Sequence, residues 1–175
     1  MFSHIFARKR QTPMIQCHSA EQLLPRFRKV VVPAAGAPYA QRALRTACRL
    51  ARMQAGAEVH LVYLIEVPRA FALAASLPGE EALADDVLSA GQRTVEGYGC
   101  AAISEIQRGR DLSGTLLKYL AQQDADLLVL GARPDGIRGL PLDLAREMYD
   151  HATVPVILDY IAGDIPRAHE TATTG

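Results

Sequence analysis

Long hydrophobic runs are absent from this sequence of 175 residues. The longest candidate, residues 70–79, falls well short of the roughly 20 apolar residues that a membrane-spanning helix requires. The first residues, MFSHIFARKRQT, carry their charges without the apolar run of a secretory signal behind them. The sequence therefore predicts a cytoplasmic protein with no membrane insertion.

Cysteine is scarce, and its spacing excludes two classes of small protein. Cys17, Cys48 and Cys100 are odd in number, and no two of them form a C-x-x-C pair. This pattern favours reduced thiols over a disulfide framework or a zinc site. His60 lies inside a predicted strand with no second ligand at metal spacing, so we expect no metal site.

No excess charge of one sign exists, because 19 basic residues balance 19 acidic ones. This balance argues against a polybasic protein that binds nucleic acid specifically. The charges are nevertheless uneven: residues 1–29 hold six basic residues against Glu21 alone. The rest of the chain is therefore acidic, with thirteen basic and eighteen acidic residues.

The length suits a single domain. Residues 1–28 show no sustained apolar period, and we expect a flexible basic leader there. Residues 29–160 are expected to form the domain, and residues 161–175 a disordered tail.

From residue 29 onward, short apolar runs alternate with segments of helical period, which indicates a parallel sheet with crossover helices. KVVVP and LLVLG lack polar alternation, as expected of strands covered on both faces. Asp111 is predicted to cap a helix whose buried stripe consists of Leu112, Leu116, Leu117 and Leu120. The first turns of another predicted helix contain four acidic residues, Glu80, Glu81, Asp85 and Asp86, where the helix dipole favours negative charge. The predicted strands are 29–33, 58–67, 101–107, 127–131 and 153–160; the other predicted helices are 39–54, 80–98 and 141–151.

Catalytic motifs are missing. There is no P-loop and no G-x-S-x-G elbow, and the G-x-G-x-x-A match at 97–102 precedes a strand instead of joining a strand to a helix. No serine or cysteine has a paired base, so we expect no catalytic residues and no enzyme activity.

The loop 131–139 is the one segment with anion-binding character. Gly131, Gly136 and Gly139 free its backbone amides, and Arg133 and Arg138 add positive charge. The loop either cradles a phosphate or simply joins a strand to a helix, and residue chemistry leaves both readings open.

Several segments together resemble the universal stress protein (UspA) superfamily. They are VVVPAAG before a helix, VHLVYLIEV, GRDLSGTLL, ADLLVLGAR and HATVPVILD, in that order over about residues 29–160. The resemblance implies a three-layer α/β/α sandwich of the Rossmann-like, adenine nucleotide alpha hydrolase-like kind, with a five-stranded parallel sheet of order 3-2-1-4-5. It also implies a homodimer with a role in stress response and no established catalysis.

Some members of that family bind ATP through an aspartate after the first strand and a pattern G-x2-G-x9-G-[ST] after the fourth. This chain departs from both. Ala35 takes the place of the aspartate, and Pro134 takes the place of the second glycine. Leu142 and Asp143 take the places of the last glycine and the hydroxyl residue. Proline offers no amide hydrogen, and a carboxylate repels phosphate. The positions that correspond to a nucleotide site are Pro33, Ala35, Gly36, Gly131, Arg133, Gly136, Arg138 and Gly139.

The sequence therefore predicts a non-catalytic, homodimeric stress-response module that acts through an unidentified protein partner and needs no cofactor. The alternative is an ATP- or AMP-binding switch, or a weak ATPase, that uses the loop 131–139.

Two surfaces suggest contacts with other molecules. The last strand, with Val154, Val156 and Leu158, would be an apolar sheet edge, which invites antiparallel pairing with a second copy. Arg42, Arg45, Arg49 and Arg52 share one face of the first helix, which is either solvated or, together with the leader, binds an acidic partner.

Overall fold

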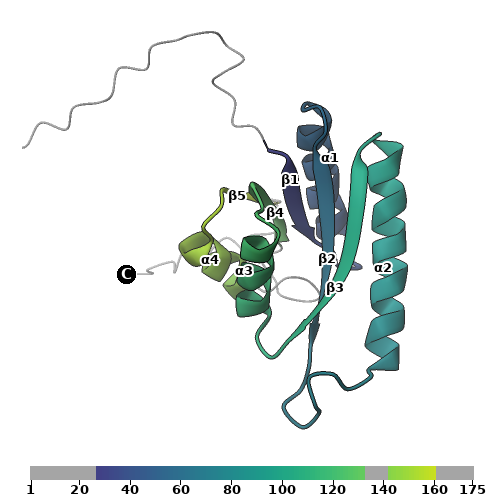
Figure 1. Cartoon of the computed structure of the whole chain (residues 1–175), viewed down its shortest axis with the longest axis vertical. Coiled ribbons are helices and arrows are strands. Elements are labelled where there is room, and N and C mark those ends of the chain that lie inside the picture. Colours follow the sequence, from purple (N-terminus) through teal and green to yellow (C-terminus); the bar gives the residue numbers. More distant parts are fainter. Residues whose placement is uncertain (1–26, 133–141, 161–175) are drawn as a thin grey trace, which may run out of the picture.

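A five-stranded parallel sheet forms the middle layer of the fold (Figure 1). The computed structural model describes residues 27–132 and 142–160. The strands β1 (Lys29–Pro33), β2 (Glu58–Glu66), β3 (Ala101–Gly109), β4 (Leu127–Ala132) and β5 (Val156–Tyr160) lie in the order β3-β2-β1-β4-β5. The order predicted from the sequence is confirmed. The predicted leader and tail lie almost wholly outside the described residues.

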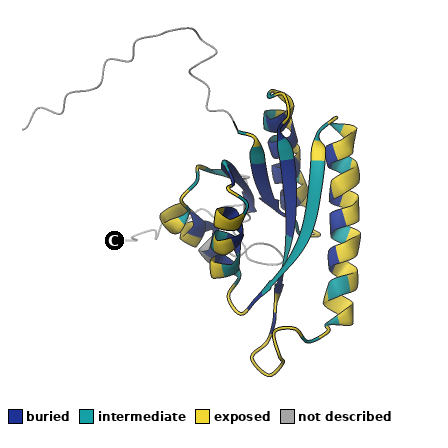
Figure 2. Ribbon diagram, in the orientation of Figure 1, coloured by how far each residue is buried: buried dark blue, intermediate teal, exposed yellow. Residues whose placement is uncertain are grey.

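Helices cover both faces of the sheet. The helices α1 (Pro38–Arg52) and α2 (Pro78–Gly97) pack on one face, and α3 (Leu112–Gln122) and α4 (Leu142–His151) pack on the other. In β1 the alternation is direct, because Val30 and Val32 belong to the core under α1 and α2, whereas Val31 belongs to the core under α3 and α4. Figure 2 shows the central strands buried and the outer helix faces exposed.

The helix predicted over 39–54 is confirmed as α1, which ends at Arg52 and buries one apolar face that consists of Tyr39, Ala40, Ala43, Leu44, Ala47, Cys48 and Ala51. Asp111 caps α3 as predicted, since its carboxylate accepts hydrogen bonds from the amides of Ser113 and Gly114. The stripe of α3 differs in part: Tyr119 is buried, whereas Leu112 and Leu117 are only partly so.

Several predicted boundaries are wrong, most of them by one or two residues. β3 runs two residues further than predicted, to Gly109, because it pairs with β2 along its full length. α2 begins at Pro78 rather than at residue 80. β5 begins at Val156 rather than at residue 153, after a bend over the residues preceding it, where proline has no amide hydrogen to give to a ladder. The start of α4 predicted at Pro141 lies outside the described residues.

Candidate functional site

The segment 34–37 connects the carboxyl end of β1 to α1, which is where open parallel sheets bind ligands. The Ala34 amide donates a hydrogen bond to the Val62 carbonyl (2.8 Å) and so extends the pairing of β1 with β2. Ala37 then takes the cap position of α1 in an extended conformation, without a side-chain cap, and Pro38 starts the helix. The side chains of this connection are methyl groups and the hydrogen of Gly36, so none of them can hydrogen-bond a ligand.

Gly131 lies at the end of β4, beside the start of α1. A Cβ at this position would stand 2.5 Å from the Tyr39 carbonyl oxygen, closer than any real contact. Glycine is therefore required here for packing of α1 against β4, whatever else its amide does. Of the other predicted nucleotide positions, Pro33 is buried at the end of β1, and Ala35 clusters with Tyr39.

The remaining predicted positions cannot be placed. Arg133, Gly136, Arg138 and Gly139 lie outside the described residues, as does Pro134. Whether the loop 131–139 cradles a phosphate therefore stays a hypothesis based on the sequence.

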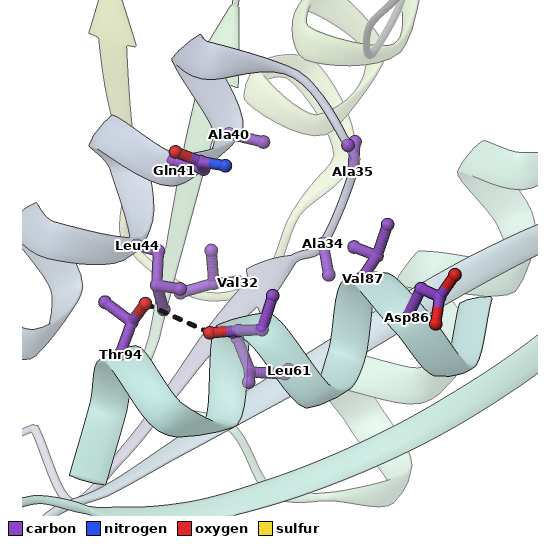
Figure 3. Close-up of a pocket in the computed structure, with 13 residues that line it drawn as sticks. Val32, Ala34, Ala35, Ala40, Gln41, Leu44, Leu61, Asp86, Val87 and Thr94 are labelled. Atoms are coloured by element: carbon purple, nitrogen blue, oxygen red, sulfur yellow. Dashed lines mark hydrogen bonds between the residues drawn. The ribbon is translucent and has the colours of Figure 1, made fainter. Parts of the chain in front are cut away.

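A cavity of about 260 Å³ lies between α1 and α2, next to the segment 34–37 (Figure 3). Its floor is made by Val32 of β1 and Leu61 of β2, both almost fully buried. The walls consist mainly of small and aliphatic side chains. The lining residues, besides those of the floor, are Ala34, Ala35, Gly36, Ala40, Gln41 and Leu44 on one side and Asp86, Val87, Ala90, Gly91 and Thr94 of α2 on the other.

Three polar side chains line this cavity: Gln41, Asp86 and Thr94. The Thr94 hydroxyl donates to the Ala90 carbonyl within α2 (3.1 Å), as Figure 3 shows. No lysine or arginine of the described chain lines the cavity, and its single charge is the Asp86 carboxylate. Because a carboxylate repels phosphate, the cavity suits an uncharged or cationic ligand better than an anionic one.

The sequence did not single out Asp86 as a site residue. The helix α2 begins at Pro78, so Glu80 and Glu81 fall in its first turn, whereas Asp85 and Asp86 come later in the helix. The helix dipole acts over the terminal turn, so Asp86 lies beyond its reach. Only the packing of α2 beside α1 shows that Asp86 borders a cavity.

A second hollow, of about 330 Å³, adjoins the start of α3 and is polar, but its arginines are already engaged. Arg110 donates hydrogen bonds to the carbonyls of Val67 (2.9 Å) and Phe71 (2.7 Å). Arg108 donates to the Ala75 carbonyl and pairs with Glu81 of α2. These two side chains hold the connection between β2 and α2, and the exposed Lys118 is the third basic side chain that lines the hollow.

His60 belongs to a buried polar network rather than to a metal site. Its Nε2 lies 3.3 Å from Glu58 Oε2, and its Nδ1 lies 3.4 Å from the Tyr119 hydroxyl, which donates to Glu105 Oε1 (3.3 Å). Burial first, and then the Glu105 carboxylate, raise the pKa of Tyr119 above its usual value. Within residues 27–132 and 142–160, no three His, Cys, Asp or Glu side chains are grouped as metal ligands.

The comparisons with known proteins agree with this architecture. The sequence profile of the universal stress protein family matches residues 26–158. The chain belongs to the universal stress protein family. No curated protein compared with it matches significantly.

Solved structures of universal stress proteins share the fold at low sequence identity. UspA from Lactobacillus plantarum is 23% identical, with a TM-score of 0.62, over 77% of this chain and 98% of that one. A universal stress protein from Archaeoglobus fulgidus, solved in complex with dAMP, is 20% identical, with a TM-score of 0.62, over 77% and 98%. A family member from Arabidopsis thaliana with AMP bound is 16% identical, with a TM-score of 0.57, over 80% and 97%.

None of the helices among the described residues is both long and apolar enough to span a bilayer.

Proposed function

We propose that this universal stress protein is a non-catalytic, homodimeric stress-response module that acts through protein partners and does not hold a nucleotide. The observation that carries the proposal is the chemistry at the carboxyl end of β1. There the segment 34–37 presents no side chain able to hydrogen-bond a ligand, and the adjoining cavity is apolar with Asp86 as its charge.

A nucleotide needs neutralising or hydrogen-bonding groups for its ribose and phosphates, and each lost polar contact lowers affinity. Ala35 stands where ATP-binding members have an aspartate, and no basic side chain of the described chain lines the cavity beside it. These two features together support a member that has lost nucleotide binding.

The homodimer is supported by the position of β5, which ends the sheet beside β4. Of the three predicted edge residues, Leu158 is 46% exposed, whereas Val156 packs partly against the core under α3 and α4, and Val154, which also packs there, precedes the strand. An exposed apolar edge with unpaired backbone groups favours pairing with another strand, and a twofold axis would let β5 of two copies meet.

The test of nucleotide binding uses the full chain purified without added nucleotide. Denatured protein is analysed by ion-pair chromatography for AMP, ADP and ATP, and the native protein is titrated with Mg-ATP and AMP by calorimetry. We expect no stoichiometric nucleotide, no micromolar affinity and no phosphate release. A double variant, Ala35→Asp with Pro134→Gly, restores two family features and should bind more tightly than the unmodified protein. Co-purified nucleotide, or a micromolar dissociation constant that Arg133→Ala abolishes, would overturn the proposal.

The second candidate is an ATP- or AMP-binding switch. It is favoured by one observation, that structures of the same fold were solved with dAMP and AMP. In this chain it would depend on Gly131, Arg133, Gly136, Arg138 and Gly139, and the same titrations decide between the two candidates.

A further inference from the structure

The cavity between α1 and α2 has the size, shape and charge of a binding site for something other than a phosphate compound. We propose that it binds a small aromatic amine of one or two rings. This inference rests on the proposed function, because a protein that holds no nucleotide leaves the carboxyl edge of the sheet free for a ligand without phosphate.

The size of the cavity sets the size of the ligand. At about 260 Å³ it exceeds the roughly 150 Å³ of apolar cavities known to hold benzene, and it falls just under the roughly 300 Å³ at which pockets for larger ligands begin. Ala40 of α1 and Ala90 of α2 both line the cavity, and their small side chains leave room for a flat ring next to Val32 and Leu61.

The apolar floor is fixed by the packing of α2 on the sheet. A Cβ at Gly91 would lie 3.0 Å from Leu61 Cδ1 and 3.6 Å from Leu44 Cδ2, so glycine lets α2 approach β2 closely there. The space that remains lies beside Ala90, one position earlier on the helix, and Ala90 is itself exposed. The site is therefore formed by a rigid apolar floor with an open side.

Charge at the rim selects an amine. Asp86 and Gln41 both line the cavity and are exposed. Within the described parts of the chain, neither of these side chains makes a hydrogen bond or an ion pair, so both can receive an N–H donor. A ring that carries an ammonium group on a short tether can fill the floor and reach the carboxylate at the rim.

Three probes with the same ring separate the contribution of charge from that of apolar burial. Tryptamine, indole and indole-3-propionate are titrated into the ¹⁵N-labelled full chain and followed by NMR. We expect tryptamine to bind about two- to fivefold more tightly than indole, the range of an exposed ion pair, and indole-3-propionate to bind most weakly. The amide shifts should centre on residues that line the cavity, Ala40, Ala90 and Thr94.

Two variants and a matched control test the location. Ala90→Leu fills the cavity from an exposed position and should weaken all three probes at least about tenfold, because the ring loses its space. Asp86→Asn should remove the preference for tryptamine over indole and leave indole unchanged. Ser89→Leu adds the same side chain at a neighbouring exposed position that does not line the cavity, and it should bind like the unmodified protein.

The proposal is overturned if no probe shifts these amides at millimolar concentration, if Ala90→Leu binds as well as Ser89→Leu, or if indole-3-propionate binds as tightly as tryptamine. Its failure is distinguishable from that of the proposed function. Mg-ATP binding, with or without displacement of tryptamine, would refute the proposed function alone. Absence of both ATP and probe binding would refute the amine site alone, and ATP binding without probe binding would refute both.

Discussion

Removal of the Asp159 carboxylate should loosen the attachment of β5 to α1. Asp159 accepts a hydrogen bond from the Thr46 hydroxyl (2.8 Å) and forms an ion pair with Nε of Arg42. The side chains of Asp159 and Arg42 are 14% and 31% exposed, so the pair is screened only in part by solvent. The first of the four arginines on α1 is therefore a structural group, whereas Arg45, Arg49 and Arg52 are exposed.

The magnitude follows from the contacts that are lost. A hydrogen bond to a charged group contributes about 1.5–3 kcal/mol and a neutral one about 0.5–1.5 kcal/mol, and partial exposure reduces the first. Among the described residues, the buried Nη2 of Arg42 has no hydrogen-bond partner, so loss of the carboxylate leaves the guanidinium with still fewer acceptors. We expect Asp159→Ala to lower the free energy of unfolding by about 2 kcal/mol and Asp159→Asn by about 1 kcal/mol, because asparagine keeps an acceptor for Thr46.

Urea denaturation followed by circular dichroism measures the change in the free energy of unfolding, with all proteins at one concentration. On heating, the melting temperature of Asp159→Ala should fall by about 4–8 °C, at roughly 2–4 °C per kcal/mol for a chain of this size. Asp150→Ala removes an exposed carboxylate from α4 and is the control, with an expected change within about 0.5 kcal/mol. If Asp159→Ala is no less stable than Asp150→Ala, the contribution assigned to this ion pair is wrong.

Three further predictions concern reactivity, acid stability and assembly. Burial, and secondarily the neighbouring Cys100, raise the pKa of the Cys48 thiol to about 11, so very little reactive thiolate exists at pH 8. Iodoacetamide at pH 8 should therefore leave Cys48 unmodified in the native protein and modify it after denaturation, as measured by peptide mass spectrometry. The backbone amide of Leu77, and secondarily the side chain of Arg108, lower the pKa of Glu81. The ionised carboxylate therefore contributes its full stability above the unfolded pKa and loses it as the pH falls through the lowered folded pKa. The difference in melting temperature between the unmodified protein and Glu81→Gln should shrink from pH 7 to pH 3, and a constant difference would contradict this. Val156→Lys with Leu158→Lys should yield a folded monomer by light scattering, and an unmodified protein that sediments as a monomer at tens of micromolar would refute the dimer.

The strands and helices could be predicted because the sequence contains clear patterns. The apolar runs of β1 and β4 have no polar alternation, which is compatible only with strands covered on both faces, and α1 repeats its small apolar residues at the helical period. Family resemblance then supplied the order of the sheet. The boundaries were less accurate, since a strand such as β3 ends where its partner β2 ends and not where its own sequence changes.

The predicted nucleotide positions divide by what the structure can place. Pro33, Ala35, Gly36 and Gly131 lie at the start of α1 as expected of the carboxyl ends of β1 and β4, and Gly131 proved to be needed for the close approach of Tyr39. The arginines and later glycines of the loop 131–139 lie outside the described residues, so nucleotide binding there remains a prediction.

The sequence by itself determined the class of fold, because the period of apolar residues is a local property that can be read directly from the order of residues. It also determined that the segment after β1 carries no polar side chain. Only the tertiary structure decided that Asp86 and Gln41, 45 positions apart, border one apolar cavity, and that Asp159 joins Arg42 across 117 positions. Such pairings depend on how the helices pack on the sheet. The spacing of residues along the chain does not give the distance between two packed helices, and that distance decides whether side chains fill the space or leave a cavity.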